Sequence, residues 1–166
     1  MKQIKFKGQP IKLFGEFIQI NDMAPSFRLV KNDLSDYYLD YTRGKNVVLN
    51  IFPSLDTSVC AASVRHFNKI ASQLPNTIVL AISKDLPFAQ GRFCTTEGIE
   101  NVVALSDFRD QQFSQEYGLL IEDGPLKGLL ARAVIVLNPV GKVIYTELVP
   151  DIAMEPDYEA VIKLLK

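Results

Sequence analysis

The sequence predicts an α/β fold in which helices flank a mixed central sheet and a β-hairpin extends the N-terminus. Apolar, β-branched runs of strand length alternate with segments of helical periodicity. That alternation favours parallel strand pairs with helices on both faces of the sheet. A second hairpin pattern near the C-terminus adds antiparallel strands. Because the chain has 166 residues and no linker-like stretch, we expect one domain, residues 1–166.

Period-two alternation predicts the N-terminal strands. The segment QIKFK alternates, GQP turns the chain, and IKLF continues it as the second strand of a hairpin. MAPSFRLV follows, and Pro25 favours an extended backbone there, with Phe27 and Leu29 on one face. The next run, KNVVLNIF at residues 45–52, is mostly apolar and contains β-branched residues, which predicts a strand buried on both faces.

The period then changes to that of a helix. The apolar face of this helix would carry Cys60, Val64, Phe67, Ala71 and Leu74. Asp56 or Thr57 can cap its start, and Pro75 ends it.

A second strand and helix come next. TIVLAIS, residues 77–83, predicts another buried strand. Residues 85–98 predict a short helix with Asp85 near its cap, Pro87 in its first turn and Gly98 at its end.

The C-terminal part completes the alternation. NVVALSD predicts a third strand, and DQQFSQEYG predicts a helix closed by Gly118. LARAVIVL and GKVIYTELV flank NPVG and predict a hairpin. EPDYEAVIKLLK predicts a terminal helix with Pro156 in its first turn. This mixed arrangement is that of a thioredoxin-like fold, although the order of elements alone also fits flavodoxin-like folds.

Composition argues against several classes of function. Eighteen basic and nineteen acidic side chains nearly cancel, and no basic stripe is visible, which disfavours nucleic-acid binding. The apolar runs are strand-sized rather than membrane-spanning, and the first residues lack a signal-peptide core. We therefore expect a cytoplasmic protein that has no membrane partner.

The two cysteines are the most informative polar or reactive residues. They are too few for a disulfide framework or a zinc site, so they are either inert core residues or a redox pair. Cys60 suits a packing role by its residue type. Its predicted place in the first turn of a helix after a buried strand suits catalysis, because free N–H groups and the helix dipole favour a thiolate there.

Thr57 and Pro53 stand near Cys60 in the sequence. Thr57 is a candidate helix cap, but its hydroxyl, one turn from the sulfur, can also hold a small oxygen substrate. Pro53 terminates the strand and could shield the sulfur from bulk water.

The motif Pro53-x-x-x-Thr57-x-x-Cys60 resembles the peroxidatic signature of the peroxiredoxins. The blocks VLNIFPSLDTSVCAASVRHFN, LPFAQGRFC, EDGPLKGLLARAVIVL and EPDYEA are similar to the bacterial thiol peroxidase (Tpx) subfamily, and the resemblance covers nearly the whole chain. It implies a peroxidase that reduces hydrogen peroxide and organic hydroperoxides, with Cys60 as the attacking thiolate. Thr57 would then orient the peroxide, Pro53 would shield the site, and Arg132 would match the family's active-site arginine.

The resemblance also assigns a role to Cys94. It would be the resolving cysteine that closes an intrachain disulfide with Cys60, the atypical 2-Cys arrangement. The family implies thioredoxin as reductant and a homodimer, and no cofactor or metal is expected because sulfur chemistry suffices. Since a disulfide needs Cα atoms within about 7 Å, we expect both helices to unwind locally, helped by Gly91 and Gly98.

Arg132 has a physical reading beside the implied one. It interrupts the apolar run LLA-R-AVIVL, where the bland interpretation is an edge-strand arginine facing water. If that strand lies beside Cys60, Arg132 supplies the cation that a buried thiolate needs.

Two other classes of function compete with the peroxidase. A disulfide oxidoreductase would want CxxC, and Thr57 occupies the first cysteine position of that motif. A binding or chaperone domain would use both cysteines only for packing.

Overall fold

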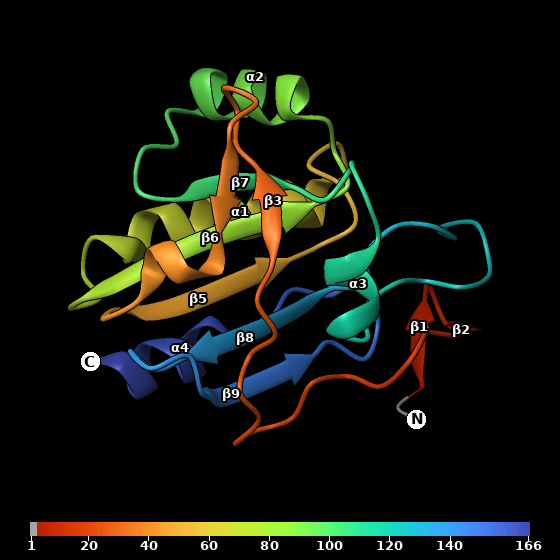
Figure 1. Ribbon diagram of the computed structural model, residues 1–166. Helices are drawn as coiled ribbons and strands as arrows, with labels where there is room; N and C mark the ends of the chain where they lie inside the picture. Colours follow the sequence, from red (N-terminus) through yellow and green to blue (C-terminus); the bar gives the residue numbers. More distant parts are fainter. Residues whose placement is uncertain (1–2) are drawn as a thin grey trace.

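The structure is a computed structural model that describes residues 3–166 (Figure 1). In chain order its elements are β1 (Ile4–Phe6), β2 (Gln9–Ile11), β3 (Arg28–Val30), β4 (Asp36–Tyr38), the 3₁₀ helix η1 (Leu39–Thr42), β5 (Asn46–Ile51), α1 (Ser58–Ala71), β6 (Thr77–Ser83), α2 (Pro87–Glu97), β7 (Val103–Ser106), α3 (Gln112–Glu116), β8 (Ala133–Leu137), β9 (Val143–Leu148) and α4 (Tyr158–Leu165). The helical and strand segments alternate as the sequence predicts.

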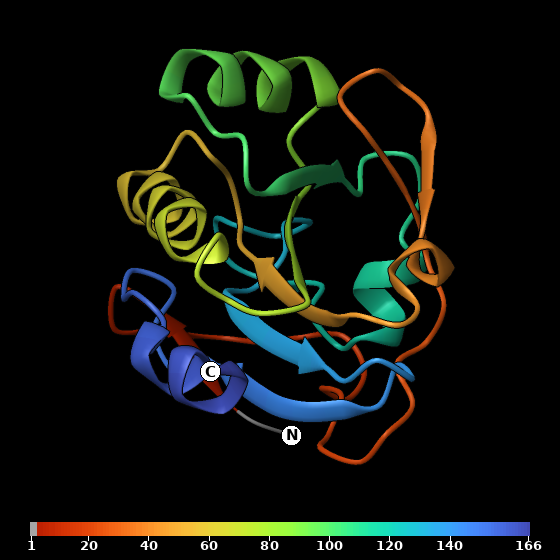
Figure 2. The ribbon, with the colours of Figure 1, turned by 90° about the vertical axis from the view of Figure 1, so that its left-hand side faces the viewer.

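Seven strands form one mixed sheet in the order β4-β3-β7-β6-β5-β8-β9. The strands β5, β6 and β7 are parallel neighbours, whereas β8 runs antiparallel to both β5 and β9. Figure 2 shows α1, α2 and α4 on one face of this sheet and α3 and η1 on the other. The predicted mixed sheet flanked by helices is confirmed.

The central strand β5 lacks the alternation of apolar and polar residues that is typical of a strand with one exposed face. Val48 packs into the cluster on the α1 side, while Val47, Leu49 and Ile51 pack into the cluster on the opposite side. Successive side chains of a strand point to opposite faces, and here both faces are covered. The strand is therefore a rigid base for the turn that follows it.

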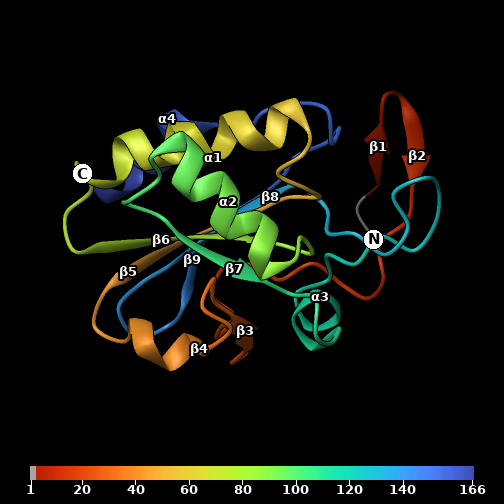
Figure 3. The same ribbon diagram turned by 90° about the horizontal axis from the view of Figure 1, so that it is seen from above.

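The N-terminal hairpin is present, with one difference from the prediction. The turn lies at Lys7 and Gly8, whose φ angles are 49° and 83°, so Gln9 and Pro10 belong to β2 instead of the turn. Glycine tolerates this left-handed backbone without a steric penalty. Figure 3 shows the hairpin beside the loop around Asp123, which lies near the hairpin's end.

The hairpin β3–β4 was not predicted as strands. The sequence gives only an extended segment there, because each strand is three residues long and too short to show a period. Val30 pairs with Ser106 of β7, which joins this hairpin to the sheet.

Three predicted helix ends shift. Leu86 is the N-cap of α2, so Asp85 is not its cap, and Asp85 makes other contacts. Pro156 precedes Asp157, the N-cap of α4, whose carboxylate accepts a hydrogen bond from the backbone N–H of Ala160 at 3.1 Å. The helix α1 ends at Ala71, before Pro75, in a short turn. The ends of α2 at Gly98 and of α3 before Gly118 are confirmed.

Candidate active site

Cys60 lies at the start of α1, the helix that follows β5 after a short connection. It is the third residue of the helix and is fully buried, with an exposed fraction of 0%. The N–H groups of a first helical turn have no partner within the helix, and they carry the positive end of its dipole. The sulfur therefore lies where a negative charge is stabilised by the backbone.

Arg132 supplies a second positive charge at this point. The register of β5 and β8 pairs Ile51 with Ala133, so Arg132 lies beside the end of β5. Its Nη2 is 3.0 Å from the Sγ of Cys60, and its side chain is only 1% exposed. Arg132 directly precedes β8 and does not interrupt it. The alternative of an edge-strand arginine that faces water is wrong, because the side chain is buried. A guanidinium at this distance favours a sulfur anion.

The guanidinium is held in place from the far side. Its Nε donates to the carbonyl of Ile152 at 2.9 Å. The N–H of Ile152 in turn donates to the carbonyl of Lys5 in the N-terminal hairpin, also at 2.9 Å. The hairpin thus braces the segment that orients Arg132. The Nη1 of Arg132 is buried and has no hydrogen-bond partner among residues 3–166, which leaves a donor available in the site.

Thr57 and Pro53 frame the turn between β5 and α1. Thr57 occupies the N-cap position of α1, but its hydroxyl makes no capping hydrogen bond within the described chain; it donates to the carbonyl of Ser54 at 2.9 Å. Because that bond uses its proton, the lone pairs of the oxygen remain available as acceptors. Thr57 is an exposed residue and Pro53 is a buried one.

Asp85 is a site residue that the sequence analysis placed only as a helix cap. Its carboxylate accepts a hydrogen bond from the hydroxyl of Ser54 at 2.7 Å and from the N–H of Leu55 at 2.8 Å. Both donors belong to the turn that leads to Cys60. A signal for this was present, since Asp85 lies two residues after the end of β6, at the sheet edge where α/β sites form.

Cys94 lies on α2 and is half-buried. Both cysteines are free thiols in this structure, and both border the same apolar cluster between the sheet and its helices. Burial raises the pKa of the Cys94 thiol, and a hydrogen bond with the side chain of Asn32 offsets part of that rise. Cys94 therefore differs from Cys60 in having an uncharged amide as its polar neighbour.

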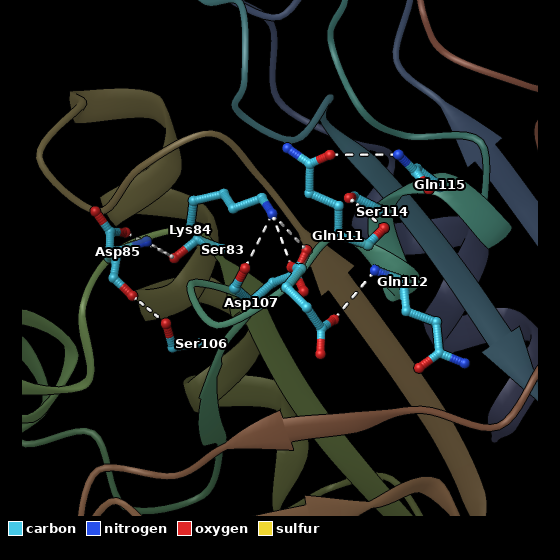
Figure 4. Close-up of polar contacts among 10 residues, drawn as sticks. Ser83, Lys84, Asp85, Ser106, Asp107, Gln111, Gln112, Ser114 and Gln115 are labelled. Atoms are coloured by element: carbon cyan, nitrogen blue, oxygen red, sulfur yellow. Dashed lines mark hydrogen bonds and ion pairs between the residues drawn. The ribbon is translucent and has the colours of Figure 1, made fainter.

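A buried ion pair lies farther along the same sheet edge (Figure 4). Lys84 follows β6 and Asp107 follows β7, and the Nζ of Lys84 is 3.1 Å from the Oδ2 of Asp107. Burial is the main cause that raises the pKa of Asp107 to about 6, against the lowering effect of Lys84. The sequence gives no sign of this pair, because only the parallel pairing of β6 with β7 brings the two residues together.

Two further features bear on cofactors and membranes. Within residues 3–166, no group of three or more His, Cys, Asp or Glu side chains is arranged to hold a metal ion. None of the described helices combines the length and apolar character that a membrane span requires.

The chain is similar to known proteins over nearly its full length. The Redoxin family matches residues 19–162. Thiol peroxidases of Corynebacterium glutamicum and Mycobacterium tuberculosis are 51% and 53% identical over 165 residues, which is 99% of this chain and of each relative. A solved structure of a peroxiredoxin-like protein from Aquifex aeolicus aligns with a TM-score of 0.94 at 39% identity, covering 99% of this chain and 96% of that one.

The fold and the family agree. The mixed sheet with its flanking helices and N-terminal hairpin is a thioredoxin-like, Redoxin-type fold, as the sequence predicts. Identity above 50% across whole chains shows that the resemblance extends beyond the fold. This chain therefore belongs to the thiol peroxidase (Tpx) subfamily of the peroxiredoxins and is a thiol-dependent peroxidase.

Proposed function

We propose that the enzyme reduces hydrogen peroxide and organic hydroperoxides through a cycle of Cys60 and Cys94, and that thioredoxin restores both thiols. The observation that carries the proposal is the 3.0 Å contact between Arg132 Nη2 and the buried Sγ of Cys60 at a helix start. A buried arginine without an anionic partner is unfavourable, and a thiolate is the anion that this contact suits.

In the first step, the Cys60 thiolate attacks the terminal oxygen of the peroxide. An S–O bond forms, the O–O bond breaks, and the leaving alkoxide or hydroxide takes up a proton to give alcohol or water. Thr57 accepts a hydrogen bond from the peroxide O–H, since its own proton is donated to Ser54. The free Nη1 of Arg132 donates to the oxygen on which charge develops. Pro53 shields the sulfur from water.

In the second step, Cys94 attacks the sulfenic sulfur of Cys60, and the new S–S bond releases water. Both residues lie on regular helices as free thiols, so the segments around them unwind to bring the sulfurs together. Gly91, which faces the side chain of Asn32, and Gly98, which ends α2 in a left-handed conformation, make α2 easy to open.

The partners follow from this cycle. The intrachain disulfide is the substrate of a dithiol reductant, for which we propose thioredoxin and hence a reducing cytoplasm. We also propose a homodimer. Exposed apolar side chains at the start of α2 (Leu86 and Phe88) and after β7 (Phe108) support a surface for self-association.

Counting thiols tests the cycle directly. Reduced wild-type protein mixed with one equivalent of hydroperoxide should lose both thiols rapidly and gain an intrachain disulfide, detected by mass spectrometry. Cys94→Ser should stop at a sulfenic acid on Cys60, and Cys60→Ser should not react at this rate. No thiol loss in the wild type would refute the peroxidase cycle, and a disulfide between chains would refute its intrachain form. Turnover with and without thioredoxin tests the reductant.

A further inference from the structure

Asp85 joins the two segments that must separate during the proposed cycle. It stands in the short connection between β6 and α2, one residue before the N-cap of the helix that carries Cys94. Its two carboxylate oxygens accept hydrogen bonds from Ser54 and Leu55 of the turn that carries Cys60. One side chain therefore bonds across from the Cys94 segment to the Cys60 segment.

The contacts of Asp85 continue into the body of α2. The hydroxyl of Ser83 donates to Oδ2 of Asp85 at 2.7 Å and accepts a hydrogen bond from Nε2 of Gln90 at 3.1 Å. Gln90 is fully buried on α2, and its Nε2 also donates to the carbonyl of Leu105 at 2.8 Å. Figure 4 shows Ser83 and Asp85 together, with Ser106 bonded to the Asp85 backbone.

The same network reaches the hydroxyl of Thr57, the proposed acceptor for the peroxide. Ser54, whose side chain bonds to Asp85, offers its carbonyl to both the N–H of Thr57 at 3.1 Å and the hydroxyl of Thr57 at 2.9 Å. Fixing Ser54 therefore fixes the direction in which Thr57 points. Hydrogen bonds to a carboxylate are among the stronger ones in proteins, so this orientation is held firmly.

We propose that Asp85 is a positioning residue that latches the Cys60 turn in its peroxide-reactive form and couples the opening of that turn to the opening of α2. This inference rests on the proposed Cys60–Cys94 cycle. With the latch closed, Thr57 is oriented for peroxide. With the latch open, the turn and α2 are released together, which the disulfide requires. The latch thus sets the lifetime of the sulfenic acid before Cys94 attacks it. It thereby also sets the fraction of sulfenic acid that a second peroxide oxidises to a sulfinic acid, with release of water or alcohol.

The test measures the two chemical steps separately by rapid quenching and mass spectrometry. Asp85→Asn keeps one acceptor oxygen but loses the charge and the second acceptor. In a Cys94→Ser background, we expect the rate constant for sulfenic acid formation to fall about tenfold, the effect of losing one charge-assisted hydrogen bond. With Cys94 present, we expect the sulfenic acid to convert to the disulfide about tenfold faster, and less sulfinic acid to form at high peroxide.

A matched control and a milder variant accompany this test. Asp22→Asn changes a carboxylate that accepts the backbone N–H of Gln19 at 2.9 Å in the exposed loop before β3, and it should change neither rate. Ser54→Ala removes one hydrogen bond of the latch and should shift both rates in the same two directions by a smaller factor. It also serves if Asp85→Asn does not fold.

Opposite changes in the two rates at an unchanged melting temperature support the latch. Opposite changes that accompany a lower melting temperature would assign them to general destabilisation and overturn it, because a less stable fold also unwinds more easily. Unchanged rates, or an equal slowing of both steps with a lower melting temperature, would overturn it and leave Asp85 a structural residue. A wild-type protein that reacts with peroxide but forms no Cys60–Cys94 disulfide would overturn the cycle and the latch together.

Discussion

Cys60 and Cys94 are both free thiols beside the same apolar cluster, yet their surroundings are opposites. Cys60 lies on α1, which buries seven residues against the sheet, and its sulfur contacts an arginine. Cys94 lies on α2, where only Pro87 and Gln90 are buried, and its polar neighbour is Asn32. The sulfur of Cys60 lies beside a positive charge, whereas the sulfur of Cys94 lies on a helix that buries few apolar side chains.

This difference separates reactivity from mobility. Segments with few buried apolar contacts open at a lower free energy than core elements do. The helix α2 can therefore open at little cost in buried area, while the base of the Cys60 site, strand β5, stays packed on both faces. In the proposed cycle the first sulfur needs a fixed environment and the second needs freedom to move.

Replacing Arg132 should reduce the difference between the two cysteines most strongly, because Cys60 would then lack a charged neighbour, as Cys94 does. We expect Arg132→Met to lower the rate constant for sulfenic acid formation by about 10²–10³-fold, the usual effect of losing a donor at a developing anion. Arg132→Lys keeps the charge but not the forked geometry and should lose less. Stopped-flow or rapid-quench kinetics in the Cys94→Ser background measure both. A Met variant within tenfold of the parent would show that Arg132 is not needed.

The next largest effect should come from the hydroxyl of Thr57, the proposed peroxide acceptor one turn before Cys60. We expect Thr57→Val to slow the peroxide step by about 10–10²-fold, because it removes the substrate acceptor, and Thr57→Ser to slow it little. The same kinetic assay applies, and a melting curve of each variant controls for stability. Equal rates in the Val and Ser variants would rule out a role for the hydroxyl.

Much of the fold could be predicted, because it is recorded in local periodicity. The predicted bounds of β5 and β6 agree with the structure to within a residue, since mostly apolar runs without alternation indicate burial on both faces. The hairpin β3–β4 was missed because three-residue strands carry no period, and the turn at Lys7 was misplaced because proline suggested a turn where it sits in a strand. Local pattern specifies long elements and leaves short ones to tertiary contacts.

The site divides in the same way. The sequence placed Cys60 at a helix start, and the structure brings Arg132 to it. The contacts of Asp85 with the Cys60 turn, and of Lys84 with Asp107, depend on which strands lie side by side. No spacing in the sequence reports which strands are neighbours, so Asp85 is predicted there only as a residue near a helix cap, and Lys84 and Asp107 are not singled out.

The ion pair between Lys84 and Asp107 gives a third prediction. The pKa of Asp107 is raised to about 6 in the folded protein, against about 3.8 when unperturbed. Between these values the unfolded chain has released this proton and the folded chain has not, so stability falls as pH rises from about 4 to 6 and is then constant. Relative to Asp107→Asn, the wild type should lose on the order of 2 kcal/mol over that range. Urea unfolding at several pH values measures this, and parallel profiles would contradict it.

The smallest expected effect concerns Cys94 itself. In Cys60→Ser, Cys94 is the only thiol, and burial raises its pKa, so its alkylation should follow a pH profile whose midpoint lies above that of the same protein in urea. Asn32→Ala removes the hydrogen bond that lowers this pKa and should move the midpoint further up. The midpoint is the quantity to compare, because burial also slows alkylation at every pH by restricting access. If folded and unfolded midpoints coincide, Cys94 is already exposed in solution, and α2 is open before any peroxide arrives.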